Sequence, residues 1–124
     1  MKELLNAFTS SLQRFEEILA QEKTITNRDA SIQRFEFTVE LGWKCVQKFL
    51  RTHNIMCRSP KECLKEAFQF GLIQDDPLWI QMMEDRNLTS HTYQESTADI
   101  VYYRLPDYLI KLKELHQALM KEKI

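Results

Sequence analysis

The segment from Arg86 to Tyr93, RNLTSHTY, gathers four side chains suited to phosphate chemistry: Arg86, Asn87, His91 and Tyr93. We expect this segment to lie where one helix ends and the next begins. A guanidinium pairs readily with phosphate oxygens, and a helix N-terminus attracts anions. Histidine serves as a general acid or base near neutral pH. The segment is therefore a candidate phosphate-binding site.

A purely structural interpretation of the same residues is also open. Arg86 can pair with Glu84, Asp85 or a neighbour's carboxylate, and His91 can cap carbonyl groups at the end of a helix. Helix ends often collect such side chains, so residue spacing alone favours this interpretation over a catalytic one.

A second group, His53, Cys57 and Cys63, imitates a metal site. Its spacing matches no strong zinc pattern and a fourth ligand is missing, so we expect ordinary surface and core residues, with no metal or other cofactor. The chain has 3 cysteines, an odd number, and no CxxC motif. We therefore expect no disulfide framework and a reducing, cytoplasmic setting.

The composition excludes several functions. The 124 residues predict one domain over 1–124. The net charge is −1, without a polybasic tract, which is not typical of a nucleic-acid-binding surface. Only 2 glycines are present, too few for a phosphate-binding loop, and the paired carboxylates of a nucleotidyltransferase are missing. The N-terminus does not resemble a signal peptide, and no window is apolar enough to predict a membrane span.

Apolar residues recur at helical spacing through most of the chain. This periodicity predicts a first helix over about 2–21 and a second over about 28–53, with Asn27 as its N-cap. The second helix carries Phe37 and Trp43 on different flanks, an apolar arc wider than one core stripe needs. We expect this helix to be buried on two sides and to mediate a homodimer.

The second half of the chain contains clear helix boundaries. The sequence SPKE at 59–62 predicts a capping box with proline at the first helical position, and Gly71 is expected to end that short helix. Asp76-Pro77 predicts the start of another helix, running towards residue 90.

The last helix is predicted over about 93–121. Thr92 is its expected N-cap, with Glu95 completing a capping box, and Pro106 is expected to kink it. No segment alternates with a period of two, as a strand would. The sequence therefore predicts an all-α protein, an antiparallel up-and-down four-helix bundle with one short extra helix.

RNLTSHTY also matches the motif R-x-x-x-x-H-x-Y of the HEPN superfamily, including the asparagine that this superfamily prefers after the arginine. Longer stretches resemble one branch of it, the nucleotidyltransferase substrate-binding protein family; these are Arg28–Leu50, Ser59–Tyr93 and Glu95–Tyr103. The first helix is similar only as a generic amphipathic helix, and Pro106 departs from the family pattern.

The resemblance implies a homodimeric four-helix bundle that associates with a separate, minimal nucleotidyltransferase chain. It also implies a metal-independent endoribonuclease toxin that acts on RNA. Arg86 would then bind the scissile phosphate, His91 would act on the ribose 2′-hydroxyl or the leaving oxygen, and Asn87 would support them. Adenylylation of Tyr93 by the partner would silence this activity.

A different function remains open under the same resemblance. The chain would be a non-catalytic subunit that presents substrate to the partner nucleotidyltransferase. The two functions are compatible, since the substrate that the partner modifies can be this protein itself.

Overall fold

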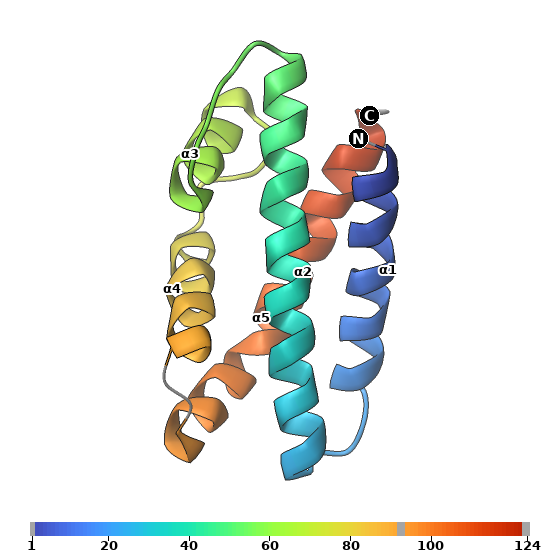
Figure 1. Cartoon of the computed structure of the whole chain (residues 1–124), viewed down its shortest axis with the longest axis vertical. Coiled ribbons are helices and arrows are strands. Elements are labelled where there is room, and N and C mark those ends of the chain that lie inside the picture. The colour runs from blue at the N-terminus through green and yellow to red at the C-terminus, as the bar shows by residue number, and fades with distance from the viewer. Residues whose placement is uncertain (1, 92–93, 123–124) are drawn as a thin grey trace.

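The first two helices of the chain form an antiparallel pair. In the computed structural model, which describes residues 2–91 and 94–122 and leaves out the side chains of 90 and 91, α1 spans Lys2–Leu19 and α2 spans Ile25–Thr52. They lie side by side (Figure 1). The predicted cap at Asn27 is wrong, because Thr24 holds the cap position in an extended conformation and its hydroxyl accepts from the Asn27 backbone N–H. The helix therefore begins one turn earlier than predicted.

The two shorter helices begin where their capping residues predict, and α3 also ends as predicted. Helix α3 spans Pro60–Phe70, and the Ser59 hydroxyl accepts from the Glu62 backbone N–H at 3.2 Å, as the capping box predicts. Gly71 follows with φ of 93°, a left-handed conformation that glycine adopts without strain. Helix α4 spans Pro77–His91, and Asp76 accepts from a backbone N–H in its first turn.

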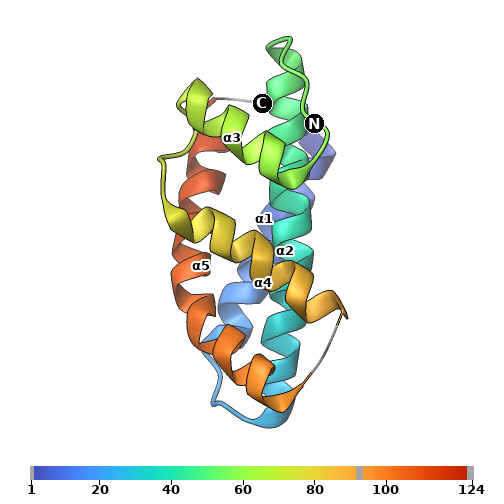
Figure 2. The same cartoon turned by 90° about the vertical axis from the view of Figure 1, so that its left-hand side faces the viewer.

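The last helix, α5, spans Glu95–Lys121 and continues through Pro106. Its first turns lean away from the direction of the rest (Figure 2). The expected cap at Thr92 is wrong, because Gln94 is the residue at the cap position and makes no side-chain cap bond. The Glu95 carboxylate is paired with Arg28 of α2 at 2.8 Å, so it is directed towards another helix instead of its own N-terminus.

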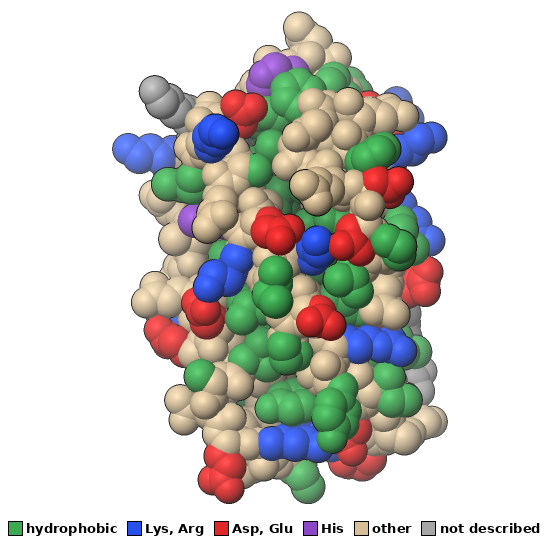
Figure 3. Space-filling view, turned by 180° about the vertical axis from the view of Figure 1, so that it is seen from behind, with side chains coloured by type: hydrophobic (Ala, Val, Ile, Leu, Met, Phe, Trp, Pro, Cys, Tyr) green, Lys and Arg blue, Asp and Glu red, His purple; other side chains and the backbone are tan. Residues whose placement is uncertain are grey.

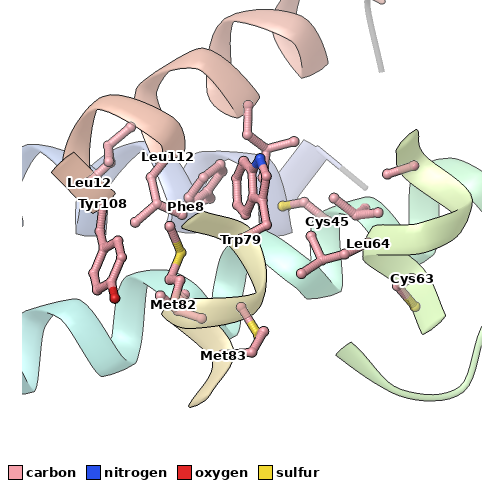
Figure 4. Packing of buried hydrophobic residues seen from close by; sticks show 14 of the residues in the cluster. Phe8, Leu12, Cys45, Cys63, Leu64, Trp79, Met82, Met83, Tyr108 and Leu112 are labelled. Carbon is pink, nitrogen blue, oxygen red and sulfur yellow. The ribbon is translucent and has the colours of Figure 1, made fainter. Parts of the chain in front are cut away.

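The hydrophobic core lies where these helices meet. Helices α1, α2 and α5 pack on one another. Helix α4 crosses α2 and α5 obliquely, and α3 lies next to the first turn of α4 (Figure 2). Phe8 of α1, Met82 of α4 and Leu112 of α5 are fully buried and point towards one another (Figure 4). At Gly42 a Cβ atom would lie 3.3 Å from the Phe8 ring, so glycine allows α1 to approach α2 closely. Every element within 2–91 and 94–122 is helical, which confirms the all-α fold.

The pairing of two cysteines contradicts the expectation that the chain has no disulfide framework. Cys57 and Cys63 form a disulfide, with their Cα atoms 5.1 Å apart. The chain turns back after α2, where Asn54 has φ of 63°, and this turn brings Cys57 against the first turns of α3. The third cysteine, Cys45, is buried as a free thiol.

The residues of the suspected metal site have other partners in the structure. His53 packs its ring on Phe49 and Phe70, with centroids 4.6 and 4.8 Å away, and both nearby cysteines are oxidised. Within the described part of the chain, no cluster of three metal-ligating side chains occurs. The helices described there also include none long and apolar enough to cross a bilayer.

Candidate functional site

Arg86 lies on the side of α4 that faces α2. Its Nη2 donates to Oε2 of Glu40 at 2.6 Å, and its Nη1 donates to Oδ1 of Asn87 at 3.3 Å. The Arg86 side chain is 28% exposed. A guanidinium has five N–H donors, so these two bonds orient it and leave donors for a ligand. The structure thus brings two predicted site residues, Arg86 and Asn87, into contact.

The partner of Arg86 is a residue that the sequence analysis did not single out. Glu40 also accepts from the Trp43 indole N–H at 3.1 Å and pairs with Lys44 at 3.5 Å. Burial raises the pKa of Glu40, but the Trp43 hydrogen bond and the charges of Arg86 and Lys44 outweigh it and lower the pKa overall. Glu40 is therefore a carboxylate at neutral pH, and it anchors the guanidinium.

Asp85, an expected partner of Arg86, faces a different helix. It is buried, and its carboxylate accepts from Arg104 at 2.8 Å and from the Tyr108 hydroxyl at 2.5 Å, both on α5. Burial and the neighbouring Asp85 charge raise the pKa of Tyr108, which stays protonated and donates. Successive residues on a helix point in different directions, so Asp85 holds α4 to α5 while Arg86 holds α4 to α2.

The remaining predicted site residues lie at the end of α4 and beyond it. His91 is the last residue of this helix, so its backbone continues the helix that carries Arg86. Its side chain, like Thr92 and Tyr93, lies outside the described residues.

Arg28 fixes the start of α5, just after this segment. Its guanidinium, 3% exposed, pairs with Glu95 at 2.8 Å, with Asp99 at 3.1 Å and with Asp29 at 3.0 Å. The hydrogen bond to Glu95 is the main cause that raises its pKa, so the charge is permanent. Sequence reasoning missed this residue, although Arg28 precedes Ile32 and Phe35 on one helical stripe, which was a usable signal.

Two shallow pockets share Arg86 as a wall. The first, of about 230 Å³, lies between the start of α3 and α4 and is lined by Ser59, Pro60, Lys61, Met83, Arg86 and Asn87. The second lies against α2 and is lined by Glu36, Phe37, Glu40 and Arg86. A ligand can thus approach the guanidinium from a side with a lysine or from a side with two carboxylates.

The face of the molecule that carries α5 has mixed charge. Figure 3 shows acidic and basic side chains interspersed with hydrophobic ones on the face that carries α5. This distribution agrees with the net charge of −1 and presents no extended basic surface there.

Comparison with known proteins identifies the family. The family model described as "Nucleotidyltransferase substrate binding protein like" matches residues 3–121. The chain belongs to this family. The family that the sequence resemblance indicated is therefore confirmed.

Individual relatives are similar to this chain in sequence, and two of them also in fold. The chain is 38% identical over 96 residues to a Haemophilus influenzae protein named "Probable ribonuclease HepT", a match that spans 70% of this chain and 66% of that protein. It is also similar to a crystal structure of a protein from Thermus thermophilus, with a TM-score of 0.85, 36% identity and coverage of 90% and 98% of the two chains.

A third relative connects the fold with the family description. It is a Haemophilus influenzae structure whose fold is described as that of a substrate binding domain of a nucleotidyltransferase. It has a TM-score of 0.81 and 30% identity, and the match covers 94% of this chain and 98% of that one. The nucleotidyltransferase substrate-binding fold therefore extends over nearly the whole of this chain.

Proposed function

We propose that this protein is the helical partner of a minimal nucleotidyltransferase and acts as a dimeric, metal-independent endoribonuclease. The observation that carries the proposal is the Arg86 guanidinium, which is oriented by Glu40 and Asn87 yet 28% exposed beside two pockets. An arginine held in this way is suited to a phosphate, because its position is fixed before the ligand arrives. The relative named a probable ribonuclease supports the same function.

The proposed reaction is cleavage of an RNA phosphodiester by its own ribose. The 2′-oxygen attacks phosphorus and the bond to the 5′-oxygen breaks, which leaves a 2′,3′-cyclic phosphate and a free 5′-hydroxyl. His91 removes the proton from the 2′-hydroxyl or delivers one to the leaving oxygen. Arg86 stabilises the charge that develops on the non-bridging oxygens, and Asn87 supports Arg86.

A homodimer is part of the proposal because an exposed apolar side chain lies beside Arg86. Phe37 of α2 is 49% exposed and lines one of the pockets that Arg86 shares. A second copy docked on this face would cover Phe37 and bring two Arg86–His91 segments to one cleft. Sedimentation of the wild type and of Phe37→Asp tests this; a monomeric wild type would contradict the dimer.

The nucleotidyltransferase partner is proposed to modify Tyr93. The phenolic oxygen attacks the α-phosphorus of ATP, AMP is transferred to it, and pyrophosphate leaves with the phenolic proton released to solvent or to a base on the partner. The added bulk and negative charge would exclude RNA phosphate from Arg86. Adenylylation would therefore switch the ribonuclease off.

An RNA cleavage assay tests the activity. The wild type is expected to produce fragments ending in cyclic phosphate in the presence of a chelator, and His91→Ala and Arg86→Ala are expected to lose this activity. Arg51→Ala is the matched control, because Arg51 is an exposed arginine at the end of α2. Cleavage by the wild type no greater than by His91→Ala would refute the enzyme.

Intact mass after co-expression with the partner chain tests the modification. One or more AMP units are expected on the wild type and none on Tyr93→Phe. Tyr103→Phe is the control, since Tyr103 is 76% exposed and therefore accessible to an unspecific enzyme. Equal labelling of both variants would overturn the assignment to Tyr93.

A second candidate function is a non-catalytic subunit that holds substrate for the nucleotidyltransferase. The observation that favours it is the 2.6 Å pair between Arg86 and Glu40, which already satisfies part of the guanidinium. Calorimetric titration with the partner chain and nucleotide tests it: association without any RNA cleavage would support it, and no association would exclude it.

A further inference from the structure

Arg86 separates two pockets of opposite chemistry. On the α2 side it faces Glu36 and Glu40, whose carboxylates repel a phosphate chain. On the α3 side the pocket has no carboxylate in its lining and contains Lys61. An RNA strand bound at Arg86 would therefore continue towards α3 and avoid the α2 side.

The wall on the α3 side is held rigidly. The Cys57–Cys63 disulfide closes the segment that contains Ser59, Pro60 and Lys61. The Gln47 side chain donates to the Cys57 carbonyl at 2.9 Å, which ties the same segment to α2. A wall held at both ends keeps its shape in the absence of a ligand, and such preorganisation favours binding.

The lining of this pocket suits one base and its phosphate. Pro60 and the buried side chain of Met83, which is 3% exposed, line the pocket with apolar groups, and a methionine thioether packs well on aromatic rings. Ser59 and Asn87 provide polar groups at the rim. Lys61 is exposed and, among residues 2–91 and 94–122, has no ion-pair partner, so its charge is available for a phosphate.

We propose that the pocket between the start of α3 and α4 is a nucleobase subsite of the RNA-binding cleft. The base occupies the pocket that Pro60 and Met83 line, and Lys61 binds the phosphate next to the one at Arg86. This subsite rests on the proposed ribonuclease function, and it makes the α3 side of Arg86 the determinant of base preference.

Binding of single nucleotides to the intact protein tests the subsite. Protein labelled with ¹³C at the methionine methyl groups is titrated with AMP, GMP, CMP and UMP, and with ribose 5-phosphate as a probe without a base. We expect the Met83 signal, assigned with Met83→Leu, to shift with at least one nucleotide and much less with ribose 5-phosphate. The Met120 signal, at the far end of α5, is the internal reference.

Charge reversal at Lys61 provides a second test of the subsite. Lys61→Glu is expected to weaken nucleotide binding and RNA cleavage by about tenfold, the effect of about one lost charge-assisted contact. Lys65→Glu is the matched control, because it lies one turn further along α3 and lines only the neighbouring pocket, whereas Lys61 lines both. Both lysines are exposed, so both variants should fold.

The outcomes separate the subsite from the ribonuclease. RNA cleavage by the wild type, with an unresponsive Met83 signal and equal cleavage by the two lysine variants, overturns the subsite and leaves the ribonuclease standing. A Met83 shift that Lys61→Glu abolishes, without any RNA cleavage, supports the subsite and removes the ribonuclease. A Met83 signal that shifts with none of the probes overturns the subsite whether or not RNA is cleaved.

Discussion

Arg86 of α4 donates to Glu40 of α2 across 2.6 Å, although the two residues are 46 positions apart in the chain. The adjacent residue, Asp85, accepts from Arg104 and Tyr108 of α5. The helix that carries the candidate site is thus attached by polar contacts to both of the helices it crosses. Such double attachment fixes the direction of the guanidinium before any ligand binds.

Replacing Glu40 by glutamine should weaken catalysis without unfolding the protein. Glutamine keeps an oxygen for the Trp43 indole but loses the charge that orients Arg86. We expect kcat/KM for RNA cleavage to fall by about tenfold, since small misplacement of a catalytic group is costly. Glu36→Gln is the control, as Glu36 lines the same pocket. A higher rate in Glu40→Gln would mean that Glu40 competes with phosphate instead of orienting Arg86.

Neutralising Asp85 should destabilise the fold. In Asp85→Asn, the buried Tyr108 hydroxyl and the Arg104 guanidinium lose their charged acceptor. Arg104 is 39% exposed, so hydrogen bonds to water replace part of its lost interaction. We expect a loss of about 2 kcal/mol in the free energy of unfolding. Urea denaturation measures it. The exposed neighbour Glu84→Gln should change it by less than about 0.5 kcal/mol, and an equally small effect of Asp85→Asn would contradict the expected role.

Thiol counting tests the disulfide and the buried cysteine together. Burial raises the pKa of the Cys45 thiol to about 12, so it should not react with a thiol reagent in the folded protein at neutral pH. Protein purified without reductant should show no reactive thiol when folded and one when denatured. Denaturation after reduction should expose all 3. Three reactive thiols without reductant would show that Cys57 and Cys63 are unpaired.

Stability should fall as the pH drops below 6.5, in part because of His116. Its ring packs on Phe8, its Nε2 lies 2.7 Å from the Thr9 hydroxyl, and burial lowers its pKa from 6.5. The unfolded chain therefore takes up the proton first, so stability is lost as the pH falls from 6.5 through the lower pKa of the folded state. Urea midpoints at pH 7.5 and 5.5 should differ less for His116→Gln than for the wild type. Equal differences would exclude His116 as the cause.

The sequence by itself determined the helices and most of their boundaries. Local signals suffice where the physics is local: apolar residues spaced by three or four define the buried faces, and the Ser59 cap, Gly71 and Asp76-Pro77 end or begin helices within one turn. The predicted caps at Asn27 and Thr92 failed because polar residues nearby, Thr24 and Gln94, occupy the cap positions instead.

The tertiary structure alone decided which polar groups meet. The turn of the chain after α2 brings Cys57 to Cys63. The crossing of α4 over α2 makes Glu40 the partner of Arg86, although Asp85 is its neighbour in the sequence. Such pairings depend on how whole helices pack, and no local spacing encodes them. The segment from Arg86 to Tyr93 was therefore recognisable as a cluster of phosphate chemistry from its residues. The side of Arg86 that is open to a phosphate chain was set by the packing of α2, α3 and α4.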